Sequence, residues 1–194
     1  GGGGFMLIHM REKGTTEIFD FREVAPAKAD RDMYVKDGAI VPGRSLVGHL
    51  AAGVPGMVAG LAKVHLAHGS MPWARLLQPA IACAEEGFDV YPELEKRLVR
   101  RKNPLSLNKA AKEIFFDGDD PLTEGMRLIQ SDLAKTLRQI AAKGSDGFYK
   151  GPIADAIVKD MKAHGGLLTK ADLSGYRVRQ RIPVRGKYRD HEII

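Results

Sequence analysis

One arginine stands between two carboxylates in a short segment of the sequence. Arg22 follows Asp20 and precedes Glu23, and Pro26 bounds the loop that comes after a strand-like run. A guanidinium presents a planar fork that can hold a carboxylate through two parallel hydrogen bonds, and flanking acids can fix its orientation. On this spacing alone, Arg22 is either the hub of a structural ion-pair cluster or the clamp for a ligand carboxylate.

The other residue types that could do chemistry have simpler explanations. His65 and His68 lie three residues apart, but no third ligand accompanies them in a zinc-like pattern, and histidines near a helix C-terminus interact favourably with its dipole. Cys83 follows Ala80 at helical spacing, which favours a small buried side chain over a nucleophile. The acidic run 117–120 lacks the alternating ligands and distal glutamate of a calcium loop. We therefore predict no metal site and no cofactor.

The composition is that of a globular protein. The 194 residues suit one domain or a large piece of one, with 44% hydrophobic and 28% charged residues. No apolar run approaches the roughly 18 residues that a membrane span requires, and a single cysteine excludes a disulfide within this chain. The sequence starts with four glycines, without an initiator methionine or a signal peptide, and stops in a strand-like run. We therefore expect a fragment of something longer.

Those first four glycines suggest a phosphate cradle. No Gly-Lys-Ser/Thr follows them, and the next expected element is a strand rather than a helix N-terminus, so a structural turn is the better interpretation.

The net charge of +6 makes an anionic partner worth considering. The excess lies in two basic stretches, residues 96–102 and 177–189, and neither interleaves aromatic residues as a base-stacking surface does. We therefore expect no nucleic-acid partner. A non-catalytic basic helical module that binds an anionic polymer remains the alternative to an enzyme.

Periodicity and turn residues predict a small β portion, a helical middle and a β tail. Residues 5–10 and 17–21 should form a hairpin with a turn at 14–16, and alternation over 176–181 predicts a strand with one solvated face. A break is expected at Asn103-Pro104, and a loop over 117–121. A first helical segment is predicted to begin at Pro55-Gly56 and to end at Gly69, and further helices are predicted over 73–86, 92–102, 131–143 and 152–164. A capped helical turn starts at Thr169, and Leu133, Leu137 and Ile140 form a stripe that should be buried.

Six segments, spread along nearly the whole chain, match one known family in order. They are residues 1–6, 20–28, 53–60, 78–88, 146–151 and 165–176. Together they resemble the γ-glutamyltranspeptidase (γ-glutamyltransferase) family, and residues 20–28 resemble its segment with the substrate-carboxylate arginine. Each segment alone is a weak signal, but six in sequence are specific.

The resemblance implies an N-terminal-nucleophile hydrolase, made as a precursor that cleaves itself into a large and a small chain. The fold would be α+β, and residues 1–194 would be a partial large-chain region: a fragment of the family's αββα sandwich with a mostly helical middle. The start of the large chain and the whole small chain would be missing. The implied partners are the complementary small chain and glutathione or another γ-glutamyl donor. The implied location is periplasmic or secreted, although the sequence carries no targeting signal.

The resemblance also implies a mechanism. A threonine at the new N-terminus of the small chain attacks the γ-carbonyl of the donor, with its own terminal amine as base. Water or the amine of an amino acid or dipeptide then accepts the γ-glutamyl group. Arg22 would hold the α-carboxylate of that group and fix the donor for attack.

The family's Thr-Thr-His nucleophile motif does not occur in this sequence. Thr15 and Thr16 are followed by Glu17 and lie inside the chain, so neither has a free terminal amine. We therefore expect no catalytic residue here, because the nucleophilic threonine lies outside this chain. The chain alone should be inactive, and Arg22 is its one expected substrate-binding residue.

Overall fold

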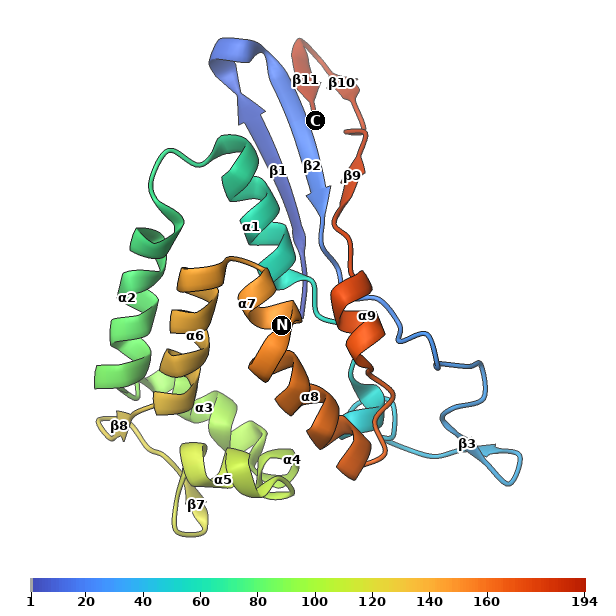
Figure 1. Cartoon of the computed structure of the whole chain (residues 1–194), viewed down its shortest axis with the longest axis vertical. Coiled ribbons are helices and arrows are strands. Elements are labelled where there is room, and N and C mark those ends of the chain that lie inside the picture. The colour runs from blue at the N-terminus through green and yellow to red at the C-terminus, as the bar shows by residue number, and fades with distance from the viewer. Residues whose placement is uncertain (1) are drawn as a thin grey trace. The chain divides into compact units, whose positions relative to one another are not determined.

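The computed structural model describes residues 2–194, which form two compact units. The first unit combines the residues up to Ser70 with Ser145–Ile194, and the second is Met71–Gly144. Helices hold more residues than strands, so this is a mixed helix and sheet structure with a helical majority (Figure 1). Within residues 2–194, no helix is both long and apolar enough to cross a membrane.

The first unit contains an antiparallel sheet of three strands. β1 (Phe5–Met10) pairs along its whole length with β2 (Thr15–Asp20), and β9 (Arg179–Arg181) pairs with the other edge of β2. This register places Arg179 opposite Asp20. β9, from near the C-terminus, lies beside β2 (Figure 1). The register therefore brings Arg179 and Arg181 to the end of β2.

The turn between β1 and β2 differs from the expected one. A short 3-10 helix, η1 (Arg11–Lys13), and Gly14 at a φ of +61° connect the two strands. The prediction that Thr15 and Thr16 lie in the turn was therefore wrong, since both belong to β2. The left-handed backbone of Gly14 completes the turn two residues earlier than expected.

The first unit contains a core of six buried side chains. Within that core Val54 and Leu173 are 1% exposed, and the others are Tyr149, Ala154, Leu168 and Tyr176. The remaining helices and strands of the first unit are β3 (Val35–Lys36), β4 (Ala39–Ile40), η2 (His49–Ala51), α1 (Met57–His68), α7 (Asp146–Tyr149), α8 (Gly151–Ala163), α9 (Lys170–Gly175), β10 (Gly186–Tyr188) and β11 (His191–Ile193).

The capped start of α9 is confirmed. The Thr169 hydroxyl accepts the Asp172 N–H at 3.2 Å, and the Asp172 carboxylate accepts the Thr169 N–H at 2.8 Å. This capping box satisfies donors that the first turn of a helix otherwise leaves unpaired. The strand expected over 176–181 is shorter than predicted, because Tyr176 follows α9 directly as a buried core residue.

The second unit is mostly helical. Its two longest helices, α2 (Trp73–Glu86) and α6 (Ser131–Lys143), lie side by side, and the Trp73 indole N–H donates to the Ile140 carbonyl at 2.9 Å. A separate core forms around Val90 and Leu128, both 2% exposed. The other elements are β5 (Phe88–Asp89), α3 (Pro92–Arg100), α4 (Lys102–Ser106), α5 (Lys109–Phe115), β6 (Phe116–Asp117), β7 (Asp120–Pro121) and β8 (Arg127–Leu128).

Several predictions in the second unit need correction. The predicted helix 92–102 ends at Arg100. Asn103 and Pro104, where the break was expected, lie in the first turn of α4, where a proline is tolerated. The expected loop 117–121 is a tight hairpin of β6 and β7. In the stripe predicted on α6, Ile140 is buried and Leu137 half-buried, but Leu133 is 42% exposed.

Candidate functional site

Arg22 lies just beyond the end of β2, where the glycine-rich start of the chain runs alongside it. The Gly4 N–H donates to the Phe21 carbonyl at 3.2 Å, and the Phe21 N–H donates back to Gly4 at 2.9 Å. A Cβ atom on Gly3 would come within 2.7 Å of the Arg22 Cα and 2.6 Å of the Glu23 nitrogen. The glycines of this segment thus allow a close backbone approach that fixes the course of residues 21–23.

The start of α1 supports the same backbone from another direction. A Cβ on Gly60 would collide with the Phe21 ring, and a Cβ on Gly56 would collide with the Tyr176 hydroxyl. That hydroxyl donates a 2.8 Å hydrogen bond to the carbonyl of Arg22. The Arg22 backbone is therefore held by a buried tyrosine from the far end of the sequence.

Asp20 completes the support of the Arg22 backbone. Its Oδ1 accepts the Arg22 N–H at 3.1 Å, and its Oδ2 accepts both Nε and Nη2 of Arg181, at 3.0 and 2.8 Å. The hydrogen bond from the Arg22 N–H lowers the pKa of the Asp20 carboxyl below its usual value. Burial acts in the opposite direction, and the Arg181 guanidinium lowers the pKa further. Asp20 is therefore a charged positioning group at physiological pH.

The guanidinium of Arg22 forms an ion pair with the neighbouring Glu23. Its Nη2 lies 3.4 Å from Oε1 of Glu23, and 56% of the Arg22 side chain is exposed. The sequence suggested that both flanking acids could orient this guanidinium. In the structure only Glu23 pairs with it, whereas Asp20 binds the backbone N–H of Arg22 and the side chain of Arg181. The planar fork thus stays accessible to a ligand carboxylate.

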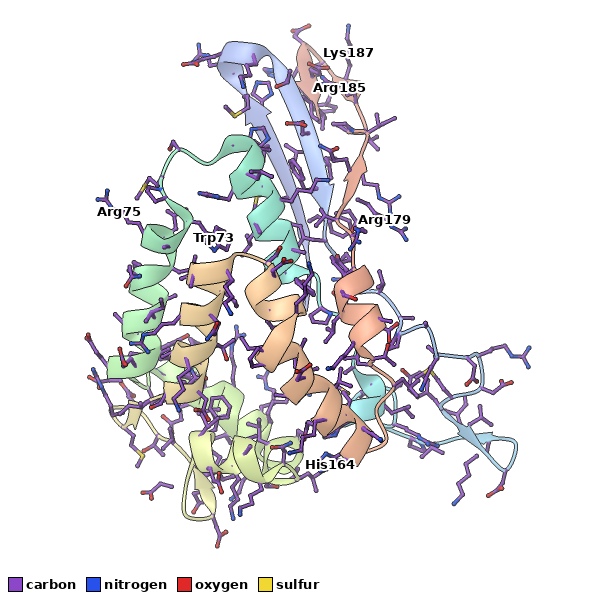
Figure 2. The ribbon with its side chains drawn as sticks, viewed as in Figure 1. Trp73, Arg75, His164, Arg179, Arg185 and Lys187 are labelled. Atoms are coloured by element: carbon purple, nitrogen blue, oxygen red, sulfur yellow. The ribbon has the colours of Figure 1, made fainter. Side chains whose placement is uncertain are left out.

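A cleft of about 270 Å³ opens beside this guanidinium. Its walls carry four arginines and two acids, so the cleft has an excess of positive charge suited to an anion. Arg179 reaches it from β9 (Figure 2). The lining residues are Phe5, Asp20, Arg22, Glu23, Val24, Tyr176, Arg177, Arg179 and Arg181.

The sequence pointed to Arg22 as a candidate but not to the neighbours that share its cleft. Arg179 and Arg181 stood out only as part of a basic stretch. The pairing of β9 with β2 converts that stretch into one wall of the cleft. The alternation of arginines at 177, 179 and 181 was the available signal, because it indicated a strand with arginine on one side.

The other residues weighed from the sequence lie apart from this cleft. Cys83 is exposed, so its predicted burial was wrong: α2 buries Ile81 and Ala84 instead. His68 on α1 pairs with Glu17 of β2, with Nε2 and Oε2 2.8 Å apart. Thr16 bonds His9 across the hairpin at 2.9 Å.

The acidic run and the basic stretches are partly neutralised by ion pairs. Asp119 pairs with Lys112 at 2.6 Å, and Lys102 pairs with Asp120 at the same distance. In the second basic stretch, Arg185 pairs with Glu192 at 2.8 Å. These contacts fit a solvated charged surface better than a ligand site.

The fold defines the class of protein. A solved γ-glutamyltranspeptidase from Helicobacter pylori superposes on the whole of this chain with a TM-score of 0.96 and 42% identity, and the match covers 56% of that chain. A γ-glutamyltranspeptidase from Pseudomonas nitroreducens does so with a TM-score of 0.92 and 36% identity, again over 56% of its chain. Such neighbours are γ-glutamyltranspeptidases and related N-terminal-nucleophile hydrolases.

The sequence comparison narrows the class to one family. The family model of γ-glutamyltranspeptidase matches residues 1–194, so the chain belongs to the γ-glutamyltranspeptidase family. The glutathione hydrolase proenzyme of Escherichia coli is 44% identical over 195 residues, covering all of this chain and 33% of that relative. The chain thus spans about a third of the length of the curated relatives it matches.

Proposed function

We propose that this chain is part of the large subunit of a γ-glutamyltransferase that cleaves γ-glutamyl amide bonds. Glutathione and related amides would be the donors, and water or the amine of an amino acid or dipeptide would accept the γ-glutamyl group. The nucleophile would be the N-terminal threonine of a complementary small chain from the same precursor. Membership of the family and the proenzyme names of its relatives support this assignment.

The observation that carries the proposal is the setting of Arg22. The main chain around Arg22 is fixed by hydrogen bonds between Gly4 and Phe21, from the Arg22 N–H to Asp20, and from the Tyr176 hydroxyl to the Arg22 carbonyl. Its guanidinium meanwhile stays open to a cationic cleft. A rigidly mounted fork suits the α-carboxylate of a γ-glutamyl group. Holding that carboxylate would place the γ-carbonyl, several bonds away, at a constant distance for attack.

The arrangement of the strands suits a partial domain. The three-stranded sheet of residues 5–20 and 179–181 would be one part of an αββα sandwich, with the small chain supplying further strands. Exposed apolar side chains on this sheet, Phe5 at 64% and Leu7 at 47%, support such a partner. The proposed location is periplasmic or secreted, as the family resemblance implies.

Polymer binding is the weaker alternative. The basic face of α3 borders a hollow of about 510 Å³ lined by Glu93, Lys96, Arg97, Arg100 and Arg101. However, Lys96 already pairs with Glu93 at 3.1 Å, and the hollow offers no aromatic surface for stacking. An anionic polymer held there would show affinity that falls steeply with salt.

Kinetics of the complete enzyme test the proposal. Arg22→Ala should lower kcat/KM for a γ-glutamyl anilide by about 100-fold or more, equivalent to about 3 kcal/mol. Arg22→Lys should recover little of this, because an ammonium lacks the planar fork. Arg31→Ala is the matched control, since Arg31 is an exposed arginine of the same unit that pairs with its neighbour Asp32. Unchanged kcat/KM in both Arg22 variants would contradict the proposal.

A further inference from the structure

Three metal-ligating side chains converge at the C-terminal end of α8, away from the arginine cleft. They are His49 of η2, Asp160 of α8 and His164, which directly follows α8. Figure 2 labels His164 at this end of α8. One ligand atom from each lies within 4.8 Å of the others. His49 Nε2 is 2.7 Å from Asp160 Oδ2, and His164 Nδ1 is 3.2 Å from Asp160 Oδ1.

The chain around the cluster keeps these groups together. The Gly166 N–H donates to the Met161 carbonyl at 2.8 Å and turns the chain back at the end of α8. A Cβ on Gly166 would lie 3.1 Å from the Cβ of His49, so the glycine allows η2 to approach closely. The two imidazole rings stack with their centroids 4.4 Å apart and their planes at 16°. His49 is 20% exposed, so the cluster is anchored on one side and open to solvent on the other.

Local hydrogen bonding and electrostatics both suit a cation. His164 Nδ1 also lies 2.9 Å from the Asp160 carbonyl oxygen, so this nitrogen faces both the main chain and the side chain of Asp160. The C-terminal end of a helix also carries partial negative charge, which favours a cation beside His164.

We propose that His49, Asp160 and His164 bind a divalent transition-metal ion, with Zn²⁺ as the best-suited ion. Two imidazole nitrogens and one carboxylate oxygen match the donors that Zn²⁺ takes in proteins, whereas Mg²⁺ and Ca²⁺ prefer oxygen alone. Ligands of a tetrahedral Zn²⁺ lie about 3.3 Å apart, so small side-chain movements bring these groups into position. A fourth position would remain for water.

This site would link two distant parts of the chain. His49 and Asp160 are separated by 111 residues, and a shared ion would tie η2 to α8. The sequence predicted no metal because its one close pair of histidines is His65 and His68, whereas His49 meets Asp160 and His164 only through the fold. The inference does not depend on the function proposed for Arg22.

Zinc binding to the complete protein tests the proposal. The protein, free of any histidine tag and stripped with a chelator, is titrated with ZnCl₂ by calorimetry, and bound zinc is counted by elemental analysis after gel filtration. The wild type should bind one more Zn²⁺ per chain than the His49→Gln/His164→Gln double variant. Asp160→Asn should weaken binding to the same site by at least about 10-fold.

His9→Gln is the control, since His9 is a histidine of β1 outside the cluster, and it should bind zinc like the wild type. Circular dichroism identifies variants that fail to fold, and His164→Asn alone, at a half-exposed position, provides a milder test. Equal stoichiometry and affinity in the wild type and in a folded cluster variant would overturn the proposal. Absence of saturable zinc binding by the wild type would also overturn it.

Discussion

Asp20 and Arg181 lie 161 residues apart in sequence, yet one oxygen of the Asp20 carboxylate accepts two hydrogen bonds from the Arg181 guanidinium. The other oxygen accepts the backbone N–H of Arg22. Both oxygens are therefore occupied, and the side chain of Asp20 does not compete with a ligand for the Arg22 guanidinium. The pair joins β9 to β2 and fixes the residue proposed to hold the substrate.

Removal of Asp20 should weaken both the fold and the site. Asp20→Ala leaves the Arg181 guanidinium and the Arg22 N–H without this partner, which should lower the free energy of unfolding by about 2 kcal/mol. Urea unfolding of the complete protein measures this loss. Asp32→Ala serves as control, because the Asp32 carboxylate is exposed and pairs with Arg31 at the surface. Equal stability of both variants would contradict the role of Asp20.

The same carboxylate should make stability depend on pH. The pKa of Asp20 is lower in the folded protein than in the unfolded chain. The Asp20 carboxylate therefore makes its full contribution to the free energy of unfolding when the pH is above its pKa in the unfolded chain, about 3.9. That contribution is lost as the pH falls through the lower folded value. The stability difference between wild type and Asp20→Asn should therefore shrink as the pH falls below about 4. A stability difference that grew as the pH fell would contradict a lowered pKa of Asp20 in the folded protein.

Gly60 on α1 should not tolerate a methyl group. Its Cβ would meet the Phe21 ring, which is 3% exposed and precedes Arg22 directly. Gly60→Ala should lower the free energy of unfolding by about 1–3 kcal/mol through overpacking, and should also reduce kcat/KM by displacing Arg22. Gly175→Ala is the matched control, since a Cβ there meets no atom of residues 2–194 within 4 Å. Thermal unfolding of both variants compares them directly.

The chain alone should release no chromophore from a γ-glutamyl anilide. The proposed nucleophile is a threonine at the N-terminus of a second chain, whereas Thr15 and Thr16 are internal residues of β2. The complete enzyme, which contains both chains in full, should turn over the same anilide. Turnover by the chain alone that survives mutation of Thr15 and Thr16 would mean that it contains a complete active site.

Local features of the fold were predictable because their signals are local. The bounds of α2 and α6 and the end of α1 follow from apolar periodicity and the glycine after each helix, at Gly87, Gly144 and Gly69. The start of α9 follows from the capping sequence at Thr169. Burial was harder to predict: on α6 the packed face includes Ala134 and Ile140, so the stripe is rotated away from Leu133.

The candidate site was only partly predictable because it depends on long-range pairing. Arg22 was identified from its neighbours and from the family resemblance, but the second partner of Asp20 comes from β9. Nothing in the segment around residue 20 indicates that Arg181 or Tyr176 will reach it. The His49 and Asp160 pair was missed for the same reason, since no short motif joins residues 111 positions apart.

The most direct test of the central claim compares two donors that differ in one group. A γ-glutamyl anilide carries the α-carboxylate that Arg22 is proposed to bind, and the corresponding 4-aminobutyryl anilide lacks it. In the complete wild-type enzyme, kcat/KM should be about 100-fold or more higher for the donor with the carboxylate. Arg22→Ala should remove most of this preference and leave the poorer donor nearly unaffected. An equal loss for both donors would contradict a contact between Arg22 and the α-carboxylate.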